Sequence, residues 1–219
     1  MFIGHFGVGF GAKSVAPKIS LGTLFVAAQF IDLLWPTLLL LGVERVRIVP
    51  GATVVTPLLF EQYPISHSLL AVAGWALLVG LISLVLWRQP RRAFVLGALV
   101  ISHWGLDAIV HRPDLPLYPG SEILIGMKAW SSLPLTLAIE VPIFALGVWL
   151  YGRVTRPDDA IGKWGFRWLV IFMGIVYGGN LFGPPPPSTT AIAWSGQLQW
   201  LLVLWGYWID SHRHVLGHG

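Results

Sequence analysis

Residues 65–111, "ISHSLLAVAGWALLVGLISLVLWRQPRRAFVLGALVISHWGLDAIVH", decide the fold. They form two apolar segments, 65–87 and 92–111, which are separated by the basic turn "WRQPRR" at 87–92. A helix needs about 20 predominantly apolar residues to cross the hydrocarbon core of a bilayer, and both segments meet that length. We therefore expect two membrane-spanning helices joined by a short, positively charged turn.

Four more segments share this apolar character. Breaks at "GRVTRPDDAIGK" (152–163) and "GPPPPSTT" (183–190) separate them, because proline runs and charged loops do not continue an apolar helix. Residues 1–18 are too short and glycine-rich for a span, and predict a short helix that packs on the bundle or re-enters the membrane. The sequence thus predicts an all-α polytopic integral membrane bundle, a single transmembrane domain over 1–219 with about six transmembrane helices plus the short N-terminal helix. The four further spans are expected at 19–42, 132–151, 165–183 and 191–209.

The composition agrees with this class of protein. Hydrophobic residues make up 55% of the chain and charged residues 11%, and the mean hydropathy is +0.72; a soluble domain is nearer a quarter charged. The chain has no cysteine, which excludes disulfides and thiolate metal sites. Twelve tryptophans suit anchoring at two membrane interfaces. The net charge of +4 is small, and we interpret it as membrane topology and not as a nucleic-acid surface.

The positions of the basic residues predict the orientation. With the N-terminus in the cytoplasm, only Arg45, Arg47, Arg112 and Lys128 of the 14 Lys and Arg fall on the outer side. Loops facing the cytoplasm are enriched in Lys and Arg. We expect a multi-pass protein of the inner (plasma) membrane, surrounded by membrane lipids, with both termini in the cytoplasm. A homo-oligomer is compatible with this arrangement.

Several ionisable residues fall within the predicted spans. Asp32 and Glu140 lie mid-span, His103 and Asp107 lie toward the outer end of the third span, and His67 opens the second. A charged group at the bilayer centre costs about 3 kcal/mol, so such residues usually face the bundle interior and serve a function. His103 and Asp107 are four residues apart and share a helix face, where an imidazole and a carboxylate can bind one metal ion. Nitrogen and oxygen ligands without sulfur favour zinc over manganese or iron.

Structural roles are the alternative for each of these residues. His103 and Asp107 could form an interhelical hydrogen bond, and Asp32 and Glu140 could be buried structural carboxylates. His111, Arg112 and Asp114 could belong to an interfacial loop. The polar tail is more typical of a disordered terminus than of a metal site; its candidate ligands are Asp210, His212, His214 and His218.

Two motifs carry a resemblance to a family. "ISHSLL" (65–70), followed by "ISHWGLDAIVHRPDLPLYPG" (101–120), resembles the YdjM-type family of membrane-bound metal-dependent hydrolases. The resemblance covers about residues 1–120 and implies a metal set of His5, His67, His103 and Asp107, with Asp32 beside it. Two family features differ: the Pro-Asp-x-Asp segment is "FIDLLW" here, and "EQYP" stands where the family has His-Arg-Gly.

The resulting expectation is a hydrolase that uses a divalent metal ion. Asp32 or Glu140 would act as the general base, and Arg112 and His111 would bind an amphipathic or lipid-like substrate at the outer interface. Two other classes remain open. Intramembrane Asp, Glu and His residues also build transporters and proton or metal pathways, and a non-catalytic structural subunit would use the same groups only to join helices.

Overall fold

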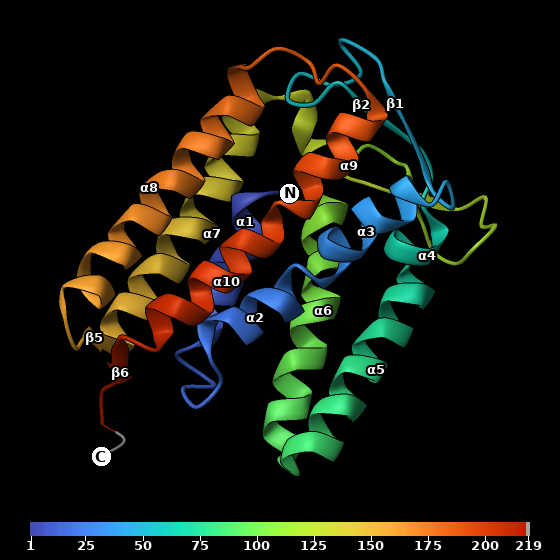
Figure 1. Ribbon diagram of the computed structural model, residues 1–219. Helices are drawn as coiled ribbons and strands as arrows, with labels where there is room; N and C mark the ends of the chain where they lie inside the picture. Colours follow the sequence, from blue (N-terminus) through green and yellow to red (C-terminus); the bar gives the residue numbers. More distant parts are fainter. Residues whose placement is uncertain (218–219) are drawn as a thin grey trace.

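Four helices of the computed structural model are long and apolar enough to cross a membrane, and most of the chain is helical. The structure describes residues 1–217. The four helices are α5 (Leu69–Trp87), α6 (Pro90–Val110), α7 (Leu133–Val154) and α8 (Ala160–Phe182) (Figure 1). Helix α5 packs against α6, and the N-terminal helix contacts both α6 and α7. The predicted mostly helical fold with several helices able to span a membrane is therefore confirmed.

Two of the other predicted spans are broken helices. The segment expected at 19–42 consists of α2 (Leu21–Ala28) and α3 (Phe30–Leu40), which bend by 59° at Gln29. The segment expected at 191–209 consists of α9 (Thr189–Gln197) and α10 (Gln199–Asp210), which meet at Leu198. Within residues 1–217 the structure thus has four candidate spans, or five if α2 and α3 form one, and the count of six is not confirmed.

The N-terminal helix α1 (Ile3–Ala12) lies inside the bundle. Its Phe6 and Phe10 are fully buried and meet Phe25 of α2 edge to face. Glycines allow α1 to approach α7 closely, since a Cβ added at Gly147 would lie 1.9 Å from the carbonyl oxygen of Gly7. The expected short helix is therefore a core element of the fold.

Three short antiparallel strand pairs modify the all-α prediction. The strands of the first pair are β1 (Arg45–Ile48) and β2 (Leu58–Gln62), and those of the second are β3 (Leu115–Pro116) and β4 (Leu124–Ile125). Between β2 and α5 lies the one-turn helix α4 (Pro64–His67), and the 3₁₀ turn η1 (Ala129–Ser131) precedes α7. These strands are too short for a sequence pattern of period two to reveal them.

The third pair corrects the interpretation of the polar tail as a disordered terminus. Strand β6 (Arg213–Val215) pairs with β5 (Thr155–Pro157), and the ring Nδ1 of His212 lies 2.7 Å from Asp159 Oδ2. The hydrogen bond from the Gly162 amide is the main cause, and that from His212 the second, of a pKa of Asp159 below its usual value. His214 pairs with Asp158 in the same way, and His218 lies outside the described residues.

The close contact of α1 and α7 can be tested by substitution. We expect Gly147→Ala to destabilise the fold by about 1–3 kcal/mol, because the added methyl group meets the backbone of Gly7 and the helices must separate. The matched control is Gly152→Ala in the same helix, where a Cβ has open space. Thermal unfolding in detergent is the measurement. Equal midpoints for the two variants would contradict the close contact.

Candidate metal centre

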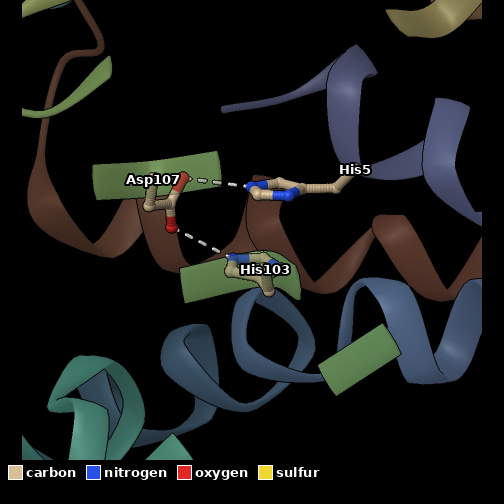
Figure 2. Close-up of side chains that lie close together, drawn as sticks. All are labelled: His5, His103 and Asp107. Atoms are coloured by element: carbon tan, nitrogen blue, oxygen red, sulfur yellow. Dashed lines mark hydrogen bonds and ion pairs between the residues drawn. The ribbon is translucent and has the colours of Figure 1, made fainter. Parts of the chain in front are cut away.

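The last turns of α6 place two predicted ligands on one buried face. His103 and Asp107 are four residues apart, and His103 Nε2 lies 3.2 Å from Asp107 Oδ2 (Figure 2). His111 ends the helix one turn later, with its Nε2 4.0 Å from Asp107 Oδ1. All three side chains are at least 97% buried. The four-residue spacing therefore places His103 and Asp107 on one helix face as predicted, and His111 lies beside them.

His67 joins this group from α4, the one-turn helix that precedes α5. It is the last residue of α4, and its Nε2 lies 3.8 Å from Asp107 Oδ2 and 3.6 Å from Asp32 Oδ1. The indole of Trp104 on α6 donates a hydrogen bond of 2.9 Å to the His67 carbonyl oxygen. This bond ties the short helix to α6 and fixes the position of the imidazole.

The bend between α2 and α3 brings Asp32 into the site. Asp32 lies in the first turn of α3, and its Oδ1 is 3.6 Å from the Nε2 atoms of both His67 and His103. The side chain is 22% exposed, in contrast to the fully buried Asp107. Asp32 is thus the carboxylate of this group with the most open surface.

His5 joins the site from α1. Its ring stacks on that of His103 with centroids 3.6 Å apart, and its Nε2 lies 3.1 Å from Asp107 Oδ1 (Figure 2). The nitrogens of the two residues that precede α1 also contact carboxylates: the Met1 ammonium donates to Asp107 Oδ1 at 2.6 Å, and Phe2 N donates to Glu140 Oε2 at 3.1 Å. The sequence carries no signal for these backbone contacts.

Outward-facing hydrogen bonds set the tautomers of three histidines. The Nδ1 atom of His103 lies 2.9 Å from the carbonyl oxygen of Ala28, which can only accept. His111 Nδ1 lies 2.9 Å from a carboxylate oxygen of Asp114, and His67 Nδ1 lies 2.6 Å from the hydroxyl of Ser66. When Nδ1–H donates outward, the lone pair of Nε2 points inward. Ordered partners of this kind behind the ring are typical of metal-binding histidines.

The inward side of these rings is suited to a cation. His103 Nε2 is buried without a hydrogen-bond partner, although the acceptor-only carboxylates of Asp32 and Asp107 lie within 3.6 Å. Lone pairs of nitrogen and oxygen directed at one another repel, and a cation between them, either a proton on Nε2 or a metal ion, removes the repulsion.

The ligand atoms form two overlapping groups. Those of His5, His103 and Asp107 all lie within 4.8 Å of one another, as do those of Asp32, His67 and His103. A buried His/Asp group that could hold a metal ion is therefore present. Its nitrogen and oxygen donors fit zinc, manganese or iron.

A cavity of about 510 Å³ opens beside this group. Asp32, His67, Asp107, His111 and Glu140 line its polar part. The lining also includes the apolar side chains of Trp35, Val54, Leu58, Phe60, Trp130 and Ile192. The cavity thus offers carboxylates and imidazoles together with a surface for hydrocarbon.

The remaining predicted site residues lie in different places. Glu140 faces the cavity from α7 but belongs to neither ligand group. Arg112 does not line the cavity; its Nε donates to Asp114 Oδ2 at 3.1 Å. His111, which we expected to bind substrate, is both a cavity residue and a neighbour of Asp107.

Three residues behind the histidines were not among the predicted site residues. Ser66 and Asp114 each lie within three positions of a histidine, so their local spacing could have suggested a hydrogen-bond role. Glu44 hydrogen-bonds to Ser66 from 22 positions away, and no spacing rule reveals such a contact.

Comparisons with family models, characterised proteins and solved structures find no match for this chain. The function must therefore be argued from the geometry of the site itself.

Removal of one ligand should release the metal ion. We expect His103→Ala and Asp107→Asn to weaken zinc binding by about tenfold or more, because His103 belongs to both ligand groups and Asp107 to one. Zinc titration and elemental analysis of protein purified in detergent measure this loss. The matched controls are His212→Ala and His214→Ala in the tail, which should retain the metal. Equal zinc content in all four variants would contradict the site.

Proposed function

We propose that this chain is a membrane-embedded, metal-dependent hydrolase whose substrate is an amphipathic, lipid-like molecule. The observation that carries the proposal is the convergence of histidine Nε2 atoms and two carboxylates in a cavity that is also lined by apolar side chains. The resemblance to the YdjM-type hydrolases points to the same class.

Hydrolysis requires an activated water and a group that accepts its proton. A divalent ion held by His67, His103, Asp32 and Asp107, with His5 beside them, would lower the pKa of a bound water toward neutrality and polarise a carbonyl oxygen. Glu140 lines the same cavity outside both ligand groups, which leaves its carboxylate free to act as general base.

The bond changes follow from these positions. The water oxygen adds to the acyl carbon of the substrate, and the water proton passes to the carboxylate of Glu140. The bond from the acyl carbon to the leaving group then breaks, and the leaving oxygen or nitrogen takes the proton from Glu140. Asp32 is the alternative base, but its position 3.6 Å from two imidazoles favours a role as ligand.

The lining of the cavity supports an uncharged reacting group. Asp32, Asp107 and Glu140 are in the lining, and no Lys or Arg is found among its described residues. The Met1 ammonium, which is also in the lining, pairs with Asp107 at 2.6 Å and leaves Asp32 and Glu140 without a cationic partner in the lining. Carboxylates disfavour the approach of an anion when no cationic side chain opposes them. A carboxylic ester or amide with an apolar tail therefore fits better than a phosphate ester.

The position along the bundle supports entry from the outer leaflet of the plasma membrane. The ligands lie in the final turns of α6, whereas the basic turn between α5 and α6 is at the opposite end of that helix (Figure 1). Basic loops favour the cytoplasm, which supports a site toward the outer interface and a cytoplasmic C-terminus. Met1 contacts Asp107, so in this orientation the N-terminus lies within the bundle at the site, which differs from the cytoplasmic N-terminus expected from the sequence.

A transporter is the second candidate, because the cavity contains three carboxylates and two histidines within the bundle. Such residues also form ion pathways in membrane proteins. Uptake of zinc or protons into liposomes that contain the protein would favour this class.

Amphipathic esters provide the direct test of hydrolysis. We expect zinc-loaded protein in mixed micelles to cleave p-nitrophenyl esters of long-chain fatty acids. Glu140→Gln should lower kcat by about 10²-fold or more with zinc retained, because a positioned base contributes this much. The control is Arg153→Gln, whose guanidinium lies over Trp149. No cleavage of ester or amide amphiphiles by the zinc-loaded protein would overturn the hydrolase proposal.

A further inference from the structure

A buried carboxylate stands behind the site. Glu44 lies four residues after the end of α3, is 2% exposed and is not among the residues that line the cavity. Its Oε1 accepts hydrogen bonds of 2.8 Å from the amides of Ile65 and Ser66, and its Oε2 accepts one of 2.6 Å from the Ser66 hydroxyl. A carboxyl group that accepts three hydrogen bonds and donates none has the pattern of an ionised carboxylate.

The Ser66 hydroxyl connects this carboxylate to His67. Its oxygen lies 2.6 Å from Glu44 Oε2 and 2.6 Å from His67 Nδ1. A hydroxyl has one proton to donate, and an ionised carboxylate can only accept it. The Ser66 oxygen must then accept a proton from His67 Nδ1–H, which leaves the lone pair of His67 Nε2 directed at Asp32 and Asp107.

We propose that Glu44 is a positioning residue that fixes the tautomer of His67 through Ser66 and so makes Nε2 available to a metal ion. The proposal rests on the metal centre argued above. It also joins two ligands, because Glu44 follows the helix that carries Asp32 and holds the helix that carries His67.

A purely structural role for Glu44 makes a different prediction. Helix α4 begins with Pro64 and has no side-chain cap of its own, so Glu44 also satisfies two of its free amides. Loss of a cap lowers stability, but it does not change the tautomer of an imidazole or the preference for a metal.

The isosteric variant Glu44→Gln separates these roles. Its amide oxygen still accepts from the Ile65 and Ser66 amides, while its NH₂ group donates to the Ser66 oxygen. The Ser66 hydroxyl then donates to His67 Nδ1, and the proton of the imidazole moves to Nε2. The expected result is an Nδ1–H tautomer of His67 in the wild type and an Nε2–H tautomer in the variant.

Nitrogen NMR of the full chain, labelled with ¹⁵N-histidine and free of metal in detergent, reads the tautomer directly. The His67 signals are assigned by their loss in His67→Ala. Zinc titration is the second readout, and we expect the Kd of Glu44→Gln to rise by about 10–100-fold. The matched control is Glu61→Gln on β2, which pairs with Arg47 at the surface and has no path to a histidine. That control should change neither quantity.

Two serine variants complete the test. Ser66→Ala leaves the amide contacts of Glu44 intact but removes the hydroxyl that connects Glu44 to His67. We expect zinc binding to weaken and the preference of His67 for the Nδ1–H tautomer to be lost. Ser66→Thr keeps the hydroxyl and should restore both.

The outcomes separate this proposal from the proposed function. An unchanged His67 tautomer in Glu44→Gln would overturn the positioning role, even where its unfolding temperature falls. A tautomer that switches as expected supports the role of Glu44 independently of catalysis. A zinc-binding wild type that cleaves no amphiphile would count against the hydrolase alone.

Discussion

The carboxylate of Asp107 is the group on which the rest of the structure depends. It is almost fully buried, and an isolated charge in such surroundings is strongly unfavourable. The Met1 ammonium lies 2.6 Å from its Oδ1. Four imidazoles also surround it, at 3.1 Å for His5, 3.2 Å for His103, 3.8 Å for His67 and 4.0 Å for His111. These rings come from α1, α4 and both sides of the end of α6. Compensation of the Asp107 charge therefore fixes the relative positions of α1, α4 and α6, which hydrophobic packing alone would not specify.

The parts of the site that were predictable are those encoded by local spacing. A His and an Asp four residues apart on a helix must share a face, and the structure places His103 and Asp107 accordingly. The long apolar segments likewise identified α5 to α8, because a helix of that length and composition has few other environments. Local chemistry fixes both features, and both could be read from one segment at a time.

The remaining features depend on contacts that are distant in the sequence. The bend at Gln29, which directs Asp32 toward His67, leaves no proline or glycine signature at that position. Arg112 was expected near the substrate, yet it pairs with Asp114, two residues away and outside the cavity lining. Glu44 and the pairing of β5 with β6 arise only when separate segments meet. Periodicity in a single sequence carries no information on such long-range contacts.

The order of the site residues along the chain has a consequence for biogenesis. His5 and Asp107 are 102 positions apart, with Asp32 and His67 between them. During synthesis the early polar groups therefore reach the bilayer before α6, which carries the carboxylate that they surround, has been made. Polar groups without partners are poorly tolerated in lipid. The centre can therefore close only after α6 has been made, and the buried position of α1 beside α6 forms late in membrane assembly.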